Sequence, residues 1–555
     1  MIDCSEAVLR YHERTTHQPG RSAPGPGFLD WANQPDPFRT YAGAPQVELP
    51  LAGNDITTWW SDLHQPGSIP ARPLDRASLG AFFELALGLT AWKEHGGSRW
   101  ALRANPSSGN LHPTEGYALL ASVPGVPAGV YHYLSRDHVL ERRLTPSPAG
   151  LASLGRLLPA GGFLLGLTSI HWREAWKYGE RAFRYCQLDV GHALAATCYA
   201  AGVLGWSVRL IEAPGDDDVS AFLGLDREED LAGLDAHDRE HPDGLLLVAP
   251  PGEIVDAAHR IEVALDALRA VTRQGVWTGR PNPLSAEHAD WPAIADVASA
   301  TAKPRTAARA ALPPESSSPP SATGVSDRLS ARALIRQRRS AVAMDGTTGL
   351  TAVAFFAMLD RLVPHAGVPP WDALPWPPRV HPVFFVHRVD GLTPGLYLLD
   401  RSSEADATLR AALRPTFSWE RPPGCPESLR LFRLEAGDAR SFARLASCQQ
   451  DIASDSAFAV AMIADLGFGL AEGPWWYRRL HWEAGALGQV LYLEAEAAGV
   501  RGTGIGCFFD DVVHEALGLA DQRFRDLYHF TVGGPLQDRR LKTLPAYPES
   551  IRQRT

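Results

Sequence analysis

Cysteine is sparse in this sequence, with six in 555 residues, and no two of them are spaced as Cys-x-x-Cys. The spacing excludes a zinc ribbon and a dithiol redox motif, and the low number excludes a disulfide scaffold. There is also no His-Glu-x-x-His motif and no evident cluster of three metal ligands. The sequence therefore predicts no metal site and gives no support to a metal hydrolase.

Long apolar runs and an excess of positive charge are also missing. No segment approaches the roughly 20 apolar residues of a membrane helix. The first residues, MIDCSEAVLRYHERTTH, carry charges where a signal peptide needs an apolar run. A net charge of −10 argues against a nucleic-acid partner, while 45% apolar residues indicate a folded chain. We therefore expect a cytoplasmic protein that binds neither membrane nor nucleic acid.

The length predicts two to four domains, at about 150 residues each. The clearest boundary is a Pro-, Ser- and Ala-rich stretch at residues 277–327, which reads as a linker. An arm rich in proline and aromatic residues covers residues 1–70. The sequence thus predicts domains at residues 71–276 and 328–555.

The two halves resemble each other. Aligning Gly191 with Gly488 also aligns Ala-Ala-Gly-Val at 200–203 with the same letters at 497–500. FLGL at 222–225 matches ALGL at 516–519, and GVYHYL at 129–134 matches GLYLLD at 395–400. Residues 185–202 and 481–499 have small or apolar residues on nearly all faces, which is typical of buried helices. Repeats of this length predict a duplicated α+β domain.

Two motifs suggest ligand contacts. RANPSSGNLHPTEGY at 103–117 offers backbone N–H groups and short side-chain donors to a planar, acceptor-rich ligand, or it is a surface turn. IRQRRSAVAMDG at 335–346 carries adjacent arginines that could bind a phosphate, or it is a solvated basic helix end.

Two further segments also allow both a functional and a purely structural interpretation. GTGIGCFFDD at 502–511 has three glycines that allow close backbone approach to a ligand, but it also fits a tight connection to an edge strand. WKYGERAFRY at 176–185 places Lys177 beside Tyr178, a pair that could move a proton or simply start a helix.

Together, in this order, these motifs resemble the flavin-dependent nitroreductase superfamily, and most closely its SagB/ThcOx-type azoline dehydrogenases. The resemblance implies two fused nitroreductase-like domains, each a mixed, mostly antiparallel sheet flanked by helices. It implies Lys177 and Tyr178 as catalytic residues, and backbone N–H groups of the glycine segment near the flavin N5. The residues that it places on FMN are Arg103, Pro106, Ser107, Ser108, Gly109, Asn110, Arg338, Arg339, Ser340, Gly504, Ile505, Gly506, and Arg540 or Lys542.

Neither half carries the complete pattern. The second half lacks Pro-Ser-Ser-Gly-Asn, and its counterpart near residues 379–382 keeps only His-Pro. The first half lacks Arg-Arg-Ser, and Gly-Trp-Ser-Val at 205–208 replaces its glycine segment. Members of the family are homodimers with FMN at the interface, so the halves are expected to form an intrachain pseudo-dimer. It would be monomeric, with one composite site and one FMN per chain.

The resemblance implies an oxidoreductase that dehydrogenates a peptide-derived azoline or a related natural-product intermediate. Two alternatives remain. One is a reductase of nitro groups, quinones or enones, with NAD(P)H as the reductant. The other is a non-catalytic scaffold subunit of a biosynthetic complex. The expected partners are a small-molecule or peptide substrate and other proteins of such a complex.

Overall fold

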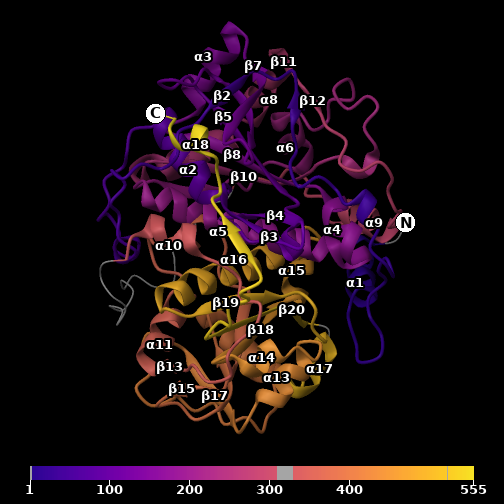
Figure 1. Cartoon of the computed structure of the whole chain (residues 1–555), viewed down its shortest axis with the longest axis vertical. Helices are drawn as coiled ribbons and strands as arrows, with labels where there is room; N and C mark the ends of the chain where they lie inside the picture. The colour runs from indigo at the N-terminus through magenta and orange to yellow at the C-terminus, as the bar shows by residue number, and fades with distance from the viewer. Residues whose placement is uncertain (1–2, 309–328, 520, 522, 555) are drawn as a thin grey trace.

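The computed structural model describes residues 3–308, 329–519, 521 and 523–554. Two antiparallel sheets form the upper and lower parts of the molecule in Figure 1. The upper sheet has the order β11-β7-β6-β5-β8-β10-β9, with β2 also paired to β7. Its strands are β2 (Gln46–Glu48), β5 (Thr114–Leu120), β6 (Gly129–Leu134), β7 (Val139–Thr145), β8 (Phe163–Ser169), β9 (Ser207–Leu210), β10 (His241–Ala249) and β11 (Val276–Trp277).

The lower sheet repeats this arrangement. Its order is β17-β16-β14-β18-β20-β19, which matches β7-β6-β5-β8-β10-β9 strand for strand. These strands are β14 (Val380–Val386), β16 (Gly395–Leu399), β17 (Leu431–Ala436), β18 (Phe458–Asp465), β19 (Arg501–Ile505) and β20 (Phe524–Gly533). The predicted α+β fold of two related units is confirmed.

The central strands are buried on both faces because helices and loops cover each side of the sheets. In β18, Val460 and Met462 belong to the core between the halves, whereas Ala461 and Ile463 belong to a separate core on the outer face. This alternation follows from the two-residue period of a strand. Continuous apolar sequences such as FAVAMIAD therefore fit a sheet between two layers.

Two long buried helices, α5 (Ala182–Val203) and α16 (Trp476–Ala497), lie side by side between the sheets (Figure 1). They meet at Gly191 and Gly485. A Cβ on Gly191 would lie 2.2 Å from the carbonyl oxygen of Trp482, and a Cβ on Gly485 would lie 2.1 Å from that of Leu188. The helices thus approach through their backbones, which requires glycine on both.

This contact corrects the alignment of the repeats. The structure pairs Gly191 with Gly485, three residues before the Gly488 that the sequence alignment selects. Both helices are followed by a glycine of positive φ, Gly205 at 71° and Gly499 at 75°. The glycine segment that starts at Gly504 therefore corresponds to the end of β9 and not to residues 205–208.

A second correction concerns the loop before the central strand. In β5, Tyr117 is opposite His132 of β6, and in β14 Val383 is opposite Leu398 of β16. This register places His381 inside the strand. Residues 372–376, and not the His-Pro at 381–382, therefore stand where Pro-Ser-Ser-Gly-Asn stands in the first half.

The chain ends cross between the halves. In the N-terminal arm, α1 (Cys4–Arg14) places the Nδ1 of His12 3.1 Å from the hydroxyl of Tyr477. In the opposite direction, β21 (Lys542–Leu544) adds an antiparallel strand to the hairpin of β3 (Leu89–His95) and β4 (Ser98–Arg103). Figure 1 shows this last segment running upward over the first half. Each half therefore holds a terminal segment of the other.

The predicted linker is only partly a linker. The described residues 277–308 include β12 (Arg280–Pro281) and α9 (Pro292–Ala300), and Arg305 forms an ion pair with Asp218 of α6 (Asp216–Leu223) at 2.5 Å. The first unit therefore extends beyond residue 276, because this segment packs on it. Residues 309–327 of the predicted linker lie outside the described residues. Within the described chain, none of the helices has the length and apolar character needed to span a membrane.

Candidate cofactor site

A cavity of about 650 Å³ opens between the halves, beside the N-terminal part of α5 and the C-terminal part of α16. Both halves build its wall, as the composite-site prediction requires. The first half contributes Lys93, Trp100, Leu102, Arg103, Pro106, Ser107, Ser108, Gly109, Asn110, His112, Asp189 and His192. The second half contributes residues 337–342, Tyr492, Arg501, Thr503, Gly504, Gly506, Tyr528 and residues of the C-terminal segment between Leu536 and Thr543.

The loop of residues 106–110 forms one side of the cavity. Gly109 and Asn110 have positive φ angles of 63° and 58°. A Cβ on Gly109 would lie 2.8 Å from the hydroxyl of Tyr178 and 2.9 Å from the Nζ of Lys177. Both side chains, at the end of α4 (His171–Tyr178), therefore contact the loop directly. They do not form the cavity wall themselves but lie against it, and glycine is what lets them approach.

Two buried carboxyl groups support this loop. The backbone N–H of Ser108 donates to Asp189 at 3.3 Å, and the hydroxyl of Ser107 donates to Glu174 at 3.4 Å. Burial raises the pKa of Asp189 to about 7. Burial and the nearby Asp189 charge raise the pKa of Glu174 as well. The motifs did not identify either acid, although an Asp inside an otherwise apolar helix was a usable signal.

We expect Asp189→Asn to remove a pH dependence of stability. The pKa of Asp189 is higher in the folded chain, at about 7, than the ordinary aspartate value of 3.8. The folded state therefore holds a proton that the unfolded state loses, and stability falls as pH rises from about 4 to 7. The loss amounts to at most roughly 4 kcal/mol. Chemical denaturation of both proteins at pH 4.5 and 7.5 measures it; an equal slope in the variant would contradict this assignment.

Arg338 is the most unusual polar group of the second-half wall. Its side chain is 3% exposed, and only Nη2 has a hydrogen-bond acceptor, the carbonyl oxygen of Arg103 at 3.0 Å. Its Nε and Nη1 are buried without a partner among the described residues, and the guanidinium lies 4.9 Å from the ring centroid of Tyr492. A buried cation without an anion is costly. An anionic ligand group in the cavity would supply the missing acceptors.

A short hydrogen-bond chain connects Ser340 to the glycine segment. The hydroxyls of Ser340 and Tyr492 are 2.8 Å apart, and the N–H of Gly504 donates to Tyr492 at 3.0 Å. The hydroxyl of Tyr492 therefore already accepts the N–H of Gly504. The side chain of Ile505 packs into the outer core of the second half, away from the cavity wall.

Glycine is nevertheless required on this wall. A Cβ on Gly504 would lie 1.8 Å from the hydroxyl of Tyr528, and one on Gly506 would lie 2.4 Å from the ring of Tyr185. The tyrosines reach over the backbone from β20 and α5. The two glycines thus make room for the side chains of Tyr528 and Tyr185, which any larger residue would displace.

The predicted basic residues of the tail do not reach the cavity. Arg540 is 75% exposed and pairs with Asp538, and Lys542 is 74% exposed and lies 3.5 Å from Glu94. Arg540 lies in the turn before β21 and Lys542 is the first residue of the strand, and both side chains face solvent. Lys93 and Arg501 line the cavity instead.

Arg339 lies at the cavity but is largely committed to the protein. Its guanidinium donates to the hydroxyl and the carbonyl oxygen of Thr90 at 3.2 Å and 3.1 Å, and also to carbonyl oxygens of its own segment. Arg103 is similarly engaged, with donations to the carbonyl oxygens of Thr114 and Pro37. These contacts join the two halves and fix the wall around Arg338.

A second cavity, of about 430 Å³, lies at the equivalent place in the other half. Asp372 and Trp376 stand where Pro106 and Asn110 stand, and Glu483 stands where Asp189 stands. Glu483 accepts the backbone N–H groups of Arg379 and Val380 and pairs with Arg401. The carboxylate of Glu483 is thus satisfied within the protein, whereas Nη2 of Arg401 and the indole Nε1 of Trp376 have no partner among the described residues.

The residues of the first cavity fit FMN. Its volume lies in the range of cofactor sites. The unpartnered donors of Arg338 suit a phosphate. Gly504 and Gly506 add no side chain to the wall, and the loop at 106–110 offers a facing surface for a flat ring. In the second cavity, the lining residue Arg401 is instead paired with Glu483.

Known proteins share this architecture. A crystal structure from Anabaena variabilis, described as a nitroreductase, superposes with a TM-score of 0.66 at 24% identity, over 96% of this chain and 99% of that one. The chain has a nitroreductase-like fold. Because one chain matches nearly the whole of the other, the agreement covers both halves together.

Two curated proteins match part of the sequence. The trifolitoxin-processing protein TfxB of Rhizobium leguminosarum bv. trifolii is 32% identical over 133 residues, which is 22% of this chain and 36% of that protein. A Methanocaldococcus jannaschii protein described as a nitroreductase is 30% identical over 124 residues, 22% of this chain and 63% of that protein. The chain thus spans less than two thirds of either relative. No family model matches the sequence. The nitroreductase-like resemblance seen in the sequence is confirmed.

Proposed function

We propose that this protein is an FMN-dependent oxidoreductase with one composite site per chain. The observation that carries the proposal is Arg338, a buried cation that lines a cofactor-sized cavity and has donors without a partner among the described residues. The nitroreductase-like fold supports a flavin as the ligand. The diverged second cavity supports a single site.

The chain's own residues would each hold a different part of the cofactor. Arg338 binds the phosphate, and the loop at 106–110 contacts the ring system from the first half. Ser340 and Tyr492 hold the backbone at Gly504 in place by their hydrogen bonds. When bound, FMN supplies a two-electron acceptor or donor for the substrate.

Within the oxidoreductases, we favour dehydrogenation of a peptide-derived azoline. Lys177 and Tyr178 lie together at the loop, with the Nζ of Lys177 5.2 Å from the Tyr178 ring centroid. A lysine and a tyrosine at this place can accept and return a substrate proton. TfxB, by its name, processes a peptide toxin, and this favours a peptide-derived substrate.

We expect Lys177→Ala and Tyr178→Phe each to lower azoline oxidation about 100-fold, as loss of a general acid–base group does. The FMN content should not change, because neither side chain forms the cavity wall. Mass spectrometry follows the loss of two hydrogen atoms from an azoline peptide. Undiminished oxidation in both variants would remove this pair from the mechanism, and NAD(P)H-driven reduction of a quinone by the wild type would favour the reductase alternative.

The count of flavins per chain tests the composite site. The visible spectrum of the purified protein, with released FMN quantified, should give one FMN per chain. Two would mean that the second cavity also binds the cofactor. None after reconstitution with FMN would favour a scaffold subunit.

A further inference from the structure

A cluster of potential metal ligands lies outside the cofactor cavity, on the first half. Asp235 and His237 flank the start of a short 3₁₀ turn before β10, and His288 lies in the segment after β12. One ligand atom from each residue lies within 4.8 Å of the others. No sequence motif marks the cluster, because about fifty residues separate His288 from the other two.

Each histidine turns the same nitrogen toward Asp235. The Nδ1 of His237 is 2.7 Å from one carboxylate oxygen of Asp235, and the Nδ1 of His288 is 3.7 Å from the other. The two imidazole rings are stacked, with centroids 5.3 Å apart and an interplanar angle of 13°. Asp235 also accepts the backbone N–H of His237, which fixes the carboxylate in place.

The other nitrogen of each ring is held by a further carboxylate. The Nε2 of His237 is 3.2 Å from Asp290, and the Nε2 of His288 is 2.8 Å from the fully buried Asp238. Metal-binding histidines in proteins typically have such an outer carboxylate, which orients the ring and makes the ligating nitrogen more basic. The contacts of Asp290 and Asp238 are an observation separate from the closeness of the three ligand atoms, and they point to the same kind of site.

The charge of the cluster also favours a cation. Asp235, Asp238 and Asp290 all face the two imidazoles, and within the described chain no ion pair joins these three acids to a lysine or arginine. We propose that Asp235, His237 and His288 bind one divalent transition-metal ion, with zinc as the preferred ion. Two imidazole nitrogens and one carboxylate form a ligand set that zinc accepts, with water at the fourth position.

The site is placed to stabilise α4. Trp172 of this helix contacts both imidazoles, at centroid distances of 6.0 Å from His237 and 5.0 Å from His288. Its indole N–H donates to the hydroxyl of Ser285 at 2.8 Å. The same helix carries Lys177 and Tyr178 at its end. A bound ion would therefore fix the segment around His288 against α4, the helix that carries Lys177 and Tyr178. The ion itself would not contact the cavity.

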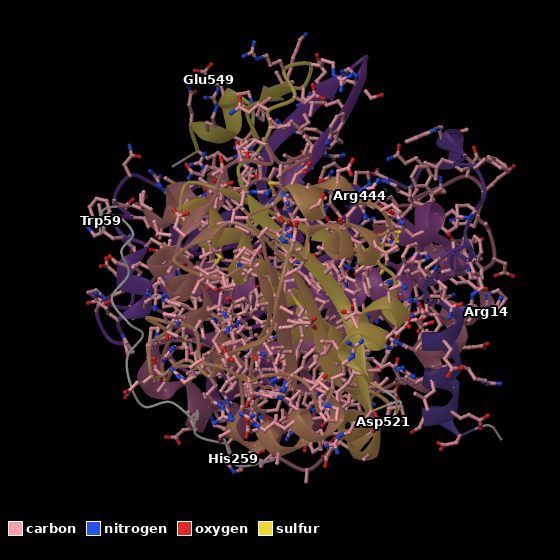
Figure 2. All side chains as sticks on the ribbon, turned by 90° about the horizontal axis from the view of Figure 1, so that it is seen from below. Arg14, Trp59, His259, Arg444, Asp521 and Glu549 are labelled. Atoms are coloured by element: carbon pink, nitrogen blue, oxygen red, sulfur yellow. The ribbon has the colours of Figure 1, made fainter. Side chains whose placement is uncertain are left out.

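Zinc titration of the chelator-treated full-length protein tests the proposal, with a chromophoric zinc chelator as competitor. We expect one zinc per chain and at least 100-fold weaker binding in His237→Ala and in His288→Ala. Asp290→Asn, which removes only an outer carboxylate, should weaken binding about 10-fold. The control is His259→Ala, whose exposed side chain on α7 (Ile254–Glu262) lies at the periphery of the molecule in Figure 2.

Cobalt(II) provides a second measurement that does not depend on the stability of the alanine variants. The wild type should give the visible absorption of a low-coordinate cobalt(II) site, and zinc should displace it. The far-ultraviolet circular dichroism of each variant shows whether it is folded. No zinc binding at micromolar concentrations by the wild type, or wild-type affinity in both folded histidine variants, would overturn the proposal.

Discussion

Arg338→Gln is expected to weaken FMN binding by about 10- to 100-fold. Hydrogen bonds to a charged group contribute about 1.5–3 kcal/mol, and each 1.4 kcal/mol is about tenfold in affinity. Arg338 lines the cavity and has buried donors that no described residue uses. Glutamine keeps the bulk and loses the charge. Fluorescence titration of the apoprotein with FMN measures the change.

A matched control distinguishes this cation from a general effect of positive charge. Arg540→Gln removes a cation of the same chemistry that is 75% exposed and paired with Asp538. Its FMN affinity should equal that of the wild type. The Arg338 variant should also be more stable than the wild type without FMN, because an unpaired buried charge is gone. Equal losses of FMN affinity in both variants would indicate that the C-terminal tail, and not Arg338 alone, binds the phosphate.

Gly485→Ala is expected to lower the free energy of unfolding by about 3 kcal/mol, at the upper end of the usual range for overpacked sites. The new methyl group would lie 2.1 Å from the carbonyl oxygen of Leu188 and 3.0 Å from the Cα of Gly191. Both are backbone atoms of α5, so no side-chain rotation relieves the overlap. The helices must separate, and the core between the halves loosens. Chemical denaturation measures the loss.

Gly155→Ala is the matched control for this prediction. Gly155 lies in α3 (Pro148–Leu157), and a Cβ there meets no atom within 4 Å. Alanine favours the helix over glycine by up to about 1 kcal/mol, so this variant should be slightly more stable. If Gly485→Ala were as stable as this control, the close contact of α5 and α16 would be disproved.

The fold was predictable because its signals are local and repeated. Strands such as GVYHYL and GLYLLD, and helices without a polar face, occur in the same order in both halves. The register between repeats was less certain, because Ala- and Gly-rich helices align almost equally well after a shift of three residues. Only the packing of Gly191 on Gly485 decides it.

Site residues that belong to a local sequence motif could be predicted. Residues whose side-chain position depends on contacts with distant parts of the chain could not. The loop at 106–110 and Arg338 reach the cavity as the sequence predicts. Arg540 and Lys542 do not, because the face that a terminal strand turns to solvent is set by its pairing with β3. Asp189 was missed because its role depends on Ser108, a distant residue brought close by the fold.

The joining of both halves in one chain has a genetic consequence. In a dimer of identical subunits, every mutation enters both sites at once, so a change that suits one wall must be tolerated by its copy. Here Asn110 and Trp376 are encoded by separate codons of one gene, as are Asp189 and Glu483. Each can vary alone, and a mutational scan of this gene would measure the two roles of a position independently.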